Sequence, residues 1–214
     1  MKIASLFSGA GGLDLGFKKA GFDVVWANEY DSSIWSTFET NFPETILDRR
    51  SIVNVLSEDV PDVAGIVGGP PCQSWSEAGA GRGIKDKRGQ LFFEYIRLLK
   101  DKQPLFFLAE NVSGILFPQH REAFGEILSQ FNDAGYAVNY KLLNAHDYDV
   151  PEDRLRVIII GYHKKLRKTF EFPEPSKNKF FLKDAIGDLG DASPAKPKNK
   201  TNGNDLPVTN HEYM

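Results

Sequence analysis

Apolar runs alternate with amphipathic stretches along the first three quarters of the chain. Most of the apolar runs are hydrophobic at successive positions and rich in β-branched and aromatic residues, which is typical of strands covered on both faces of a largely parallel sheet. Six strands are predicted, over residues 2–7, 22–28, 62–68, 104–111, 137–143 and 155–161.

Amphipathic stretches with apolar residues at helical spacing fall between these runs. Helices are predicted over residues 31–41, 90–101 and 120–135, and a further helix is predicted directly after the first strand and its glycine-rich turn. Asp31 is expected to cap the first of the three, and Gly135 to end the last. Strands that alternate with helices indicate a doubly wound α/β domain.

The composition changes after about residue 162. Residues 163–214 are rich in Pro, Lys, Asn and Gly, and only 181–189 look helical. Residues 1–161 carry 16 Lys and Arg against 22 Asp and Glu, whereas residues 162–200 carry 10 against 5. We therefore predict one domain over 1–162 and an appendage over 163–214, whose positive charge either follows nucleic-acid phosphates or belongs to a solvated tail.

The overall composition, 41% hydrophobic and 26% charged over 214 residues, suits a globular domain and excludes disorder throughout. No apolar run approaches the ~20 residues that cross a bilayer, and the N-terminus lacks a signal-peptide pattern, so a cytoplasmic protein without membrane partners is expected. One cysteine excludes an internal disulfide, and the four histidines form no paired metal-binding motif. No metal site is expected.

The stretch SLFSGAGGLDLGF runs from a strand through a glycine-rich turn into a helix. Its glycines, Gly9, Gly11, Gly12 and Gly16, do not follow the GxGxxG spacing that suits a dinucleotide pyrophosphate. Glu29 follows the second strand, where an acid can accept both hydroxyls of a ribose. These features favour a nucleoside cofactor without a pyrophosphate, and a plain tight turn is the structural alternative.

The only cysteine, Cys72, follows Pro70 and Pro71 in the stretch GGPPCQSWS, beyond the carboxyl end of a predicted strand. Two prolines restrict the backbone before the thiol, as positioned nucleophilic attack requires. A buried, inert cysteine is the alternative. The next segment, residues 79–89, is rich in Gly, Lys and Arg and is expected to form a mobile basic lid.

Two further polar groups lie at predicted strand ends. Glu110 and Asn111 end an apolar strand, where Glu110 is a candidate proton donor or acceptor or, alternatively, a turn former. Arg154 and Arg156 are two residues apart and hence on one face of a strand. Paired arginines bind phosphates or carboxylates, or form surface salt bridges.

Four of these stretches, FSGAGG, GGPPCQS, ENV and DRLRV, occur in the order in which DNA cytosine-5 methyltransferases carry them. The chain resembles that family over its whole length, and it is most similar to the HaeIII-type enzymes that modify GGCC. The resemblance implies a Rossmann-like fold that uses S-adenosylmethionine to methylate cytosine flipped out of double-stranded DNA. A role in restriction-modification follows from it.

The resemblance also implies residue roles. The thiolate of Cys72 would add to carbon 6 of cytosine, Glu110 would hold and protonate ring nitrogen 3, and Arg154 and Arg156 would orient the base. The implied cofactor-binding residues are Phe7, Ser8, Gly9, Ala10, Gly11, Gly12, Leu13, Glu29, Tyr30, Ser51, Ile52, Pro71 and Leu91.

The chain departs from the family pattern at several positions. Ser51 stands where an aspartate usually binds the adenine amino group, Asp149 replaces a glycine, Glu152 replaces a glutamine, and Ala64 replaces an aspartate. The chain also stops at Met214, before the family's target-recognition region and last motifs. We therefore expect a fragment, a truncated product or one half of a split enzyme that needs a complementing C-terminal subunit.

Three other functions are weighed against this one. Some proteins of this fold methylate a tRNA cytosine. A catalytically idle protein could instead bind nucleic acid or a partner through residues 163–214. A nicotinamide-dependent oxidoreductase is the third, and the broken GxGxxG pattern argues against it.

Overall fold

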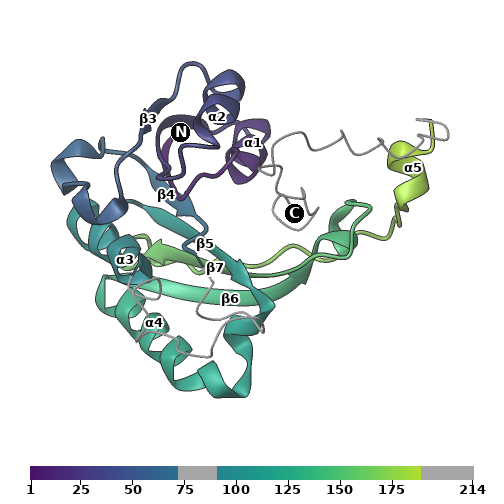
Figure 1. The fold of residues 1–214 in the computed structure, drawn as a ribbon. Helices are drawn as coiled ribbons and strands as arrows, with labels where there is room; N and C mark the ends of the chain where they lie inside the picture. The colour runs from purple at the N-terminus through teal and green to yellow at the C-terminus, as the bar shows by residue number, and fades with distance from the viewer. Residues whose placement is uncertain (72–90, 189–214) are drawn as a thin grey trace, which may run out of the picture.

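The computed structural model describes residues 1–71 and 91–188, and within them the strands form one seven-stranded sheet. The sheet order is β3-β2-β1-β4-β5-β7-β6 (Figure 1). β1 to β5 are parallel, whereas β7 is antiparallel to β5 and β6 is antiparallel to β7. The strands are β1 (Lys2–Leu6), β2 (Asp23–Asn28), β3 (Ile46–Asp48), β4 (Gly65–Gly68), β5 (Phe106–Val112), β6 (Tyr136–Asn144) and β7 (Leu155–His163).

Helices cover both faces of this sheet. The α-helices are α1 (Gly12–Lys19), α2 (Trp35–Asn41), α3 (Leu91–Lys102), α4 (Arg121–Asp133) and α5 (Leu182–Ile186). Short 3-10 helices include η1 (Ile52–Asn54), η2 (Ser57–Asp59), η4 (Ser113–Leu116), η5 (Pro118–His120), η6 (Ala145–Tyr148) and η7 (Lys164–Leu166). The helices α1 and α2 lie on one side of the sheet, and α3 and α4 lie on the other (Figure 1). This is the doubly wound α/β fold that the sequence predicts.

The larger part of the core lies under α3 and α4. Phe107 of β5 stacks on Phe131 of α4, with 4.3 Å between the ring centroids, and both side chains are fully buried. The buried Tyr95 hydroxyl of α3 lies 3.0 Å from the Ile66 carbonyl oxygen and 2.9 Å from that of Leu108. Because each buried aromatic side chain contributes about 2–3 kcal/mol, this cluster fixes α3 against β4 and β5, whose carboxyl ends carry candidate site residues.

The opposite face has a smaller core and an apolar hollow. Ile3, Val24 and Val67 are buried there beneath Phe17 and Phe22. A hollow of about 320 Å³ lies beside them, and α1 is the only described helix that contributes to its lining. Its lining residues are Met1, Phe17, Phe22, Phe106, Phe107, Leu108, Ile160, Tyr162 and Phe170.

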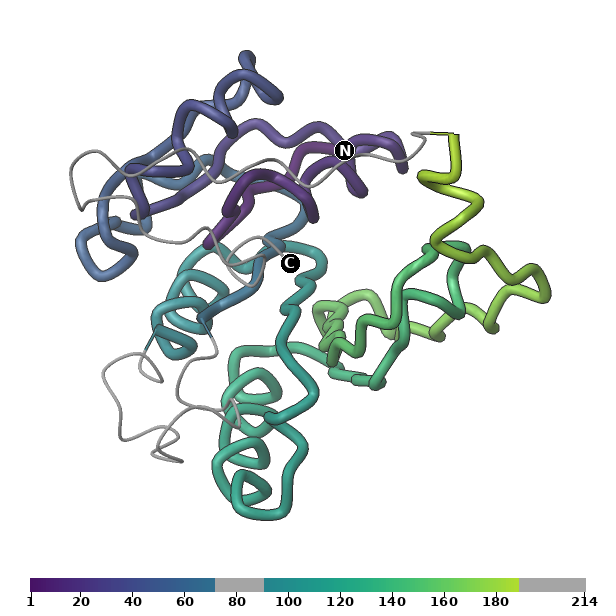
Figure 2. The backbone as a smooth tube through the Cα atoms, turned by 45° about the vertical axis from the view of Figure 1, so that its right-hand side comes forward, coloured from purple at the N-terminus to yellow at the C-terminus, as the bar shows by residue number. Residues whose placement is uncertain are grey.

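The chain beyond β7 runs away from the sheet. Figure 2 shows α5, near the yellow end of the colour bar, standing apart from the other helices. The approach to α5 is held against η6, where the Ser176 N–H donates to the Asp147 carbonyl oxygen (2.8 Å) and Lys179 forms an ion pair with the Asp147 carboxylate (2.8 Å). The sheet thus ends at His163, and the division into 1–162 and 163–214 stays a prediction.

Two expectations from the sequence need correction. The six expected strands are present, but β3 was not predicted, and β6 and β7 are antiparallel. The helix expected from residue 31 begins at Trp35, so Asp31 is not its N-cap. Asp31 Oδ1 instead accepts from the Ser33 N–H (2.9 Å) and hydroxyl (2.7 Å), which stabilises a turn before the helix.

None of the helices in the described parts of the chain combines the length and apolar character needed to cross a lipid bilayer.

Candidate active site

A pocket of about 400 Å³ opens at the carboxyl ends of β1, β4 and β5. The strand order reverses between β1 and β4, because β1 has β2 on one side and β4 on the other. Open α/β sheets bind ligands at such a point. The pocket is lined by Ser5, Phe7, Ser8, Gly12, Leu13, Asp14, Gly68, Gly69, Glu110 and Arg154.

The turn between β1 and α1 has an unusual backbone. Phe7 (φ 54°), Gly9 (φ 55°) and Gly11 (φ 89°) all lie in the left-handed region, where glycine is favoured. A Cβ at residue 11 would overlap the ring of Phe42. The turn therefore requires glycine at position 11, and it presents its backbone and the first turn of α1 to the pocket.

Glu29 fastens this turn to the end of β2. Its carboxylate accepts from the Gly9 N–H (2.9 Å) and the Asp31 N–H (2.7 Å), and its carbonyl oxygen accepts from the Trp35 indole N–H (2.9 Å). A carboxylate has about four lone-pair directions, so the two backbone donors leave acceptor capacity for ribose hydroxyls. The geometry is therefore compatible with the role that the resemblance implies.

Asn28 is a structural residue that the sequence did not single out. Its side chain is buried, and its Nδ2 donates to the carbonyl oxygens of Asp48 (3.0 Å) and Arg50 (2.8 Å). These bonds hold the segment before Ser51 against the end of β2. The feature of the sequence that could have identified Asn28 is a polar residue at the end of an apolar strand.

The structure divides the expected cofactor residues into two groups. Phe7, Ser8, Gly12 and Leu13 line the pocket. Ile52 and Leu91 pack in or against the main core, Tyr30 is 72% exposed, and Ser51 is half-buried at the start of η1. The residues outside the pocket lining are Gly9, Ala10, Gly11, Glu29, Tyr30, Ser51, Ile52, Pro71 and Leu91. Their cofactor roles stay predictions.

The Pro70-Pro71 segment is held against the end of β5. Asn111 is buried, and its Nδ2 donates to the Pro70 carbonyl oxygen (3.2 Å). Pro71 is the last residue described before a gap. Cys72, the expected nucleophile, lies outside the described residues, as does the expected basic lid over residues 79–89.

Glu110 and Arg156 form an ion pair across the β5–β7 ladder. Arg156 Nε lies 2.7 Å from Glu110 Oε1, and both side chains are about one-quarter to one-third exposed. The Glu110 carboxylate also lies close to the backbone of Gly69, because a Cβ there would be 3.1 Å from Oε2. Arg154 lines the pocket, and its Nη1 lies 3.8 Å from Glu152 Oε1. Three of the four expected catalytic residues thus lie at the pocket or in contact with it.

Asp14 and Ser5 are pocket residues that the sequence analysis missed, and they line the pocket together with Ser8, which was expected there. Asp14 and Ser5 are fully buried and Ser8 is 8% exposed. Burial raises the pKa of Asp14 to about 6, and the nearby Ser5 hydroxyl and the Asp14 backbone N–H lower it by less, without reaching hydrogen-bond geometry in the structure. The available signal was a charged residue between Leu13 and Phe17, on the face of α1 that meets the sheet.

The position of Asp149 explains one departure from the family pattern. Asp149 follows η6 with φ 65° and ψ 21°, a left-handed conformation in which a glycine is unstrained. Aspartate is one of the residues that tolerate this region, so the turn is retained at a modest cost.

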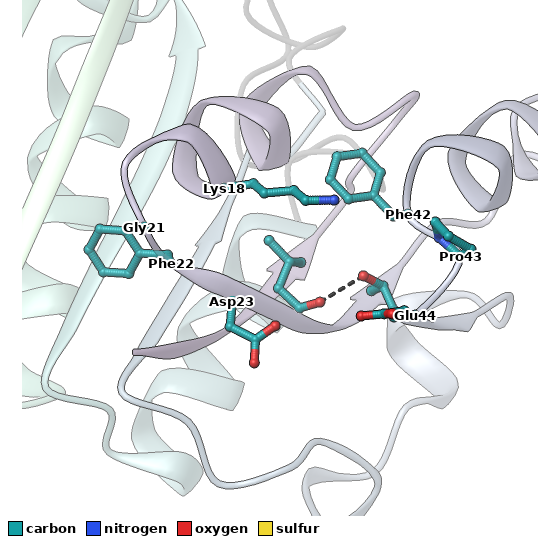
Figure 3. A pocket seen from close by; sticks show the side chains of 9 residues that line it. Lys18, Gly21, Phe22, Asp23, Phe42, Pro43 and Glu44 are labelled. Carbon is teal, nitrogen blue, oxygen red and sulfur yellow. Dashed lines mark hydrogen bonds between the residues drawn. The ribbon is translucent and has the colours of Figure 1, made fainter.

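A second hollow, of about 380 Å³, lies at the amino end of β2 (Figure 3). Lys18 lies over the Phe42 ring, 5.5 Å from its centroid, and the Thr45 hydroxyl donates to the Val24 carbonyl oxygen (2.7 Å). Asp23, at its rim, begins β2 and is therefore at the opposite end of the sheet from Glu110.

The fold and the pocket define a Rossmann-like α/β class whose solved neighbours are methyltransferases. A protein described as a DNA modification methyltransferase encoded within an E. coli prophage aligns with a TM-score of 0.75 and 32% identity, over 87% of this chain and 54% of that one. The model of the C-5 cytosine-specific DNA methylases matches residues 1–214. The chain belongs to this family.

Several type II methyltransferases match the whole chain, and two of them serve as examples. Type II methyltransferase M.FnuDI of Fusobacterium nucleatum is 56% identical, and type II methyltransferase M.MthTI of Methanothermobacter thermautotrophicus is 53% identical. The alignments cover 100% of this chain, but 63% and 64% of the two relatives. The chain therefore spans less than two thirds of their length.

Proposed function

We propose that this chain carries the catalytic chemistry of a type II restriction-modification methyltransferase, which transfers a methyl group from S-adenosylmethionine to carbon 5 of cytosine in double-stranded DNA. The observation that carries the proposal is that four separate features of the chain lie together at one edge of the sheet. The glycine turn, the Pro70-Pro71 segment, Glu110 and Arg154 come from separate parts of the sequence and meet at one edge of the sheet. The match to the C-5 cytosine-specific DNA methylases over residues 1–214 supports the proposal that these residues form a methyltransferase active site.

The residues at the pocket fit S-adenosylmethionine. Its nucleoside has no pyrophosphate, which agrees with a glycine turn that lacks the GxGxxG spacing. Glu29 has free acceptor capacity for the ribose hydroxyls, and Ser5, Ser8 and Asp14 offer buried oxygen atoms without hydrogen-bond partners. When bound, the cofactor supplies an electrophilic methyl group on a sulfonium centre.

The chain's own residues would activate the cytosine. The Cys72 thiolate adds to carbon 6 while Glu110 donates a proton to ring nitrogen 3, so that carbon 5 becomes nucleophilic and takes the methyl group. A base then removes the proton from carbon 5, the bond between carbons 5 and 6 becomes double again, and the thiolate leaves. Ring nitrogen 3 returns its proton to the Glu110 carboxylate, which restores the acid. The Arg156 ion pair fixes one oxygen of Glu110 and leaves the other toward Gly69 and the pocket.

The proposed substrate is DNA that contains GGCC. The support is the similarity to HaeIII-type enzymes in FSGAGGLDLGF, ANEYD, GGPPCQSWSE and FFLAENV, together with relatives named type II methyltransferases. A methyltransferase that protects the cell's own DNA would act in the cytoplasm.

We further propose that a complementing C-terminal polypeptide packs on the apolar hollow beside β5 and β7. The hollow is lined almost entirely by aromatic and aliphatic side chains, among them Phe106, Ile160, Tyr162 and Phe170. Exposed apolar surface of this kind marks an interaction site. The part of each relative that lies outside the alignment, about a third of its length, is chosen to test this part of the proposal.

Covalent trapping tests the function. The chain is mixed with S-adenosylmethionine and duplex DNA that carries 5-fluorocytosine in GGCC, with and without the part of M.FnuDI outside the alignment as a separate polypeptide. Fluorine cannot leave carbon 5 as a proton does, so methyl transfer would leave the protein bonded to DNA through Cys72 after denaturation.

Matched controls separate the parts of the proposal. Cys72→Ser should abolish the complex, and duplexes with 5-fluorocytosine in another sequence should give none. If a complex formed with 5-fluorocytosine-substituted tRNA and not with DNA, the substrate would be RNA. The absence of any complex in the presence of the complementing polypeptide would refute the proposed activity of this chain.

A further inference from the structure

The pocket contains three buried oxygen-bearing side chains without partners. Among the described residues, both carboxylate oxygens of Asp14 and the hydroxyls of Ser5 and Ser8 have no hydrogen-bond partner. All three residues line the pocket at the end of β1, and each is at least nine-tenths buried. A buried polar group without a partner destabilises the fold, and a charged one does so more strongly.

Most buried carboxylates are stabilised by an ion pair with a basic side chain, and within the described residues Asp14 is not. In the described parts of the chain, no Lys, Arg or His forms an ion pair with it. The charged residues that share the pocket lining are Glu110, which is paired with Arg156, and Arg154, which lies near Glu152. The first turn of α1 favours an acid, but that effect is smaller than the penalty of burying a carboxylate.

We propose that Asp14, together with the Ser5 hydroxyl, binds the α-ammonium group of the methionine moiety of the cofactor. This inference rests on the cofactor proposed above. An ammonium group has three donors and a positive charge, and it would meet an anionic oxygen pair and a hydroxyl that otherwise lack donors. The sulfonium has no hydrogen to donate, and the cofactor's carboxylate would be repelled by Asp14.

In this proposal, Glu29 binds the nucleoside end of the cofactor and Asp14 binds its amino-acid end. Glu29 binds the Gly9 N–H at the end of β2, whereas Asp14 lies on α1 at the end of β1, on the other side of the glycine turn. Asp14 is thus a positioning residue, which would fix the amino-acid end of the ligand while the nucleoside end is held near Glu29. The reacting sulfur lies between these two ends.

The experiment compares two ligands that share a nucleoside. S-adenosylhomocysteine carries the α-ammonium group, and 5′-methylthioadenosine lacks the entire amino-acid part. Their affinities are measured by calorimetry for the unmodified 214-residue chain, Asp14→Asn, Ser5→Ala and the control Asp23→Asn, whose side chain is exposed at the other end of the sheet. Loss of a charge-assisted contact should weaken S-adenosylhomocysteine about 10- to 100-fold in Asp14→Asn.

The affinity for 5′-methylthioadenosine should stay within about twofold in Asp14→Asn, and Asp23→Asn should change neither ligand. Ser5→Ala should show the same selectivity with a smaller loss. Equal weakening of both ligands, or undiminished binding of S-adenosylhomocysteine by Asp14→Asn, overturns the inference while the cofactor proposal stands. Failure of the unmodified chain to bind either ligand counts against the cofactor proposal and against the inference that rests on it.

Discussion

Asp14→Asn is the most informative single substitution, because the structure gives its effect on stability a sign and a magnitude. Burial raises the pKa of Asp14 from 3.8 to about 6 in the folded chain. The folded state therefore binds the proton more tightly than the unfolded state, so stability falls as pH rises from the unfolded pKa through the folded one. The full cost above about pH 7 is on the order of 3 kcal/mol.

The assay is urea unfolding of the unmodified chain and Asp14→Asn at about pH 4.5 and about pH 7.5. The variant has no carboxyl at this site, so the difference between the two proteins reports the titration of Asp14. The unfolding free energy of the unmodified chain relative to the variant should therefore fall by about 2 kcal/mol between the two pH values. Parallel pH profiles would refute the reasoning, because they would mean that Asp14 titrates as it does in the unfolded chain.

Three further predictions concern the turns and the catalytic acid. Gly11→Ala should destabilise the fold by about 2–4 kcal/mol, because a left-handed residue there would also strike Phe42, whereas Gly12→Ala meets no atom and should be close to neutral in thermal melts. Asp149→Gly should stabilise by about 0.5–1 kcal/mol by urea unfolding, since it relieves the left-handed conformation, and a loss of stability would contradict this. Glu110→Gln should lower methyl transfer by about 10²- to 10⁴-fold in a single-turnover assay, with only the small loss of stability expected from removing the Arg156 ion pair; full activity would exclude it as the acid.

The parts of the fold that the sequence predicts are those with dense apolar patterns. The six expected strands were predicted from continuous apolar runs, which are buried in β1 and β4 but largely exposed in β6, and the helices α3 and α4 were predicted from apolar residues at helical spacing, which are buried. The strand β3 was missed because it has three residues, of which Ile46 is 67% exposed, so no run of buried side chains marks it. Its place depends on pairing with β2 and on the Asn28 side chain, which are tertiary contacts.

Strand direction and helix starts were harder to predict than strand position. The run over 155–161 is as apolar as a central parallel strand, yet β7 runs antiparallel between β5 and β6. An apolar run records burial on two faces and not the direction of the chain. Asp31 is likewise a suitable cap by residue type, but its side chain bonds within a turn, and the helix begins four residues later.

The candidate site was predictable where polar residues interrupt apolar strands. Glu110 and Arg154 stand out in the sequence for this reason, and the structure places both at the pocket. Ser5 and Asp14 do not stand out, because a serine in a strand and an acid in the first turn of a helix are ordinary. Only the folded chain shows that these two side chains are buried together without partners.

Glu29 and Asp14 both lie at the carboxyl edge of the sheet, and the difference in their hydrogen bonding supports a ligand at Asp14. Glu29 has a structural role, because two backbone N–H groups donate hydrogen bonds to its carboxylate. Asp14 has no such bonds among the described residues and reduces the stability of the folded chain at neutral pH. Since an asparagine or an apolar side chain would avoid that cost, a cationic ligand group is the explanation that accounts both for the burial of the carboxylate and for its place in the pocket.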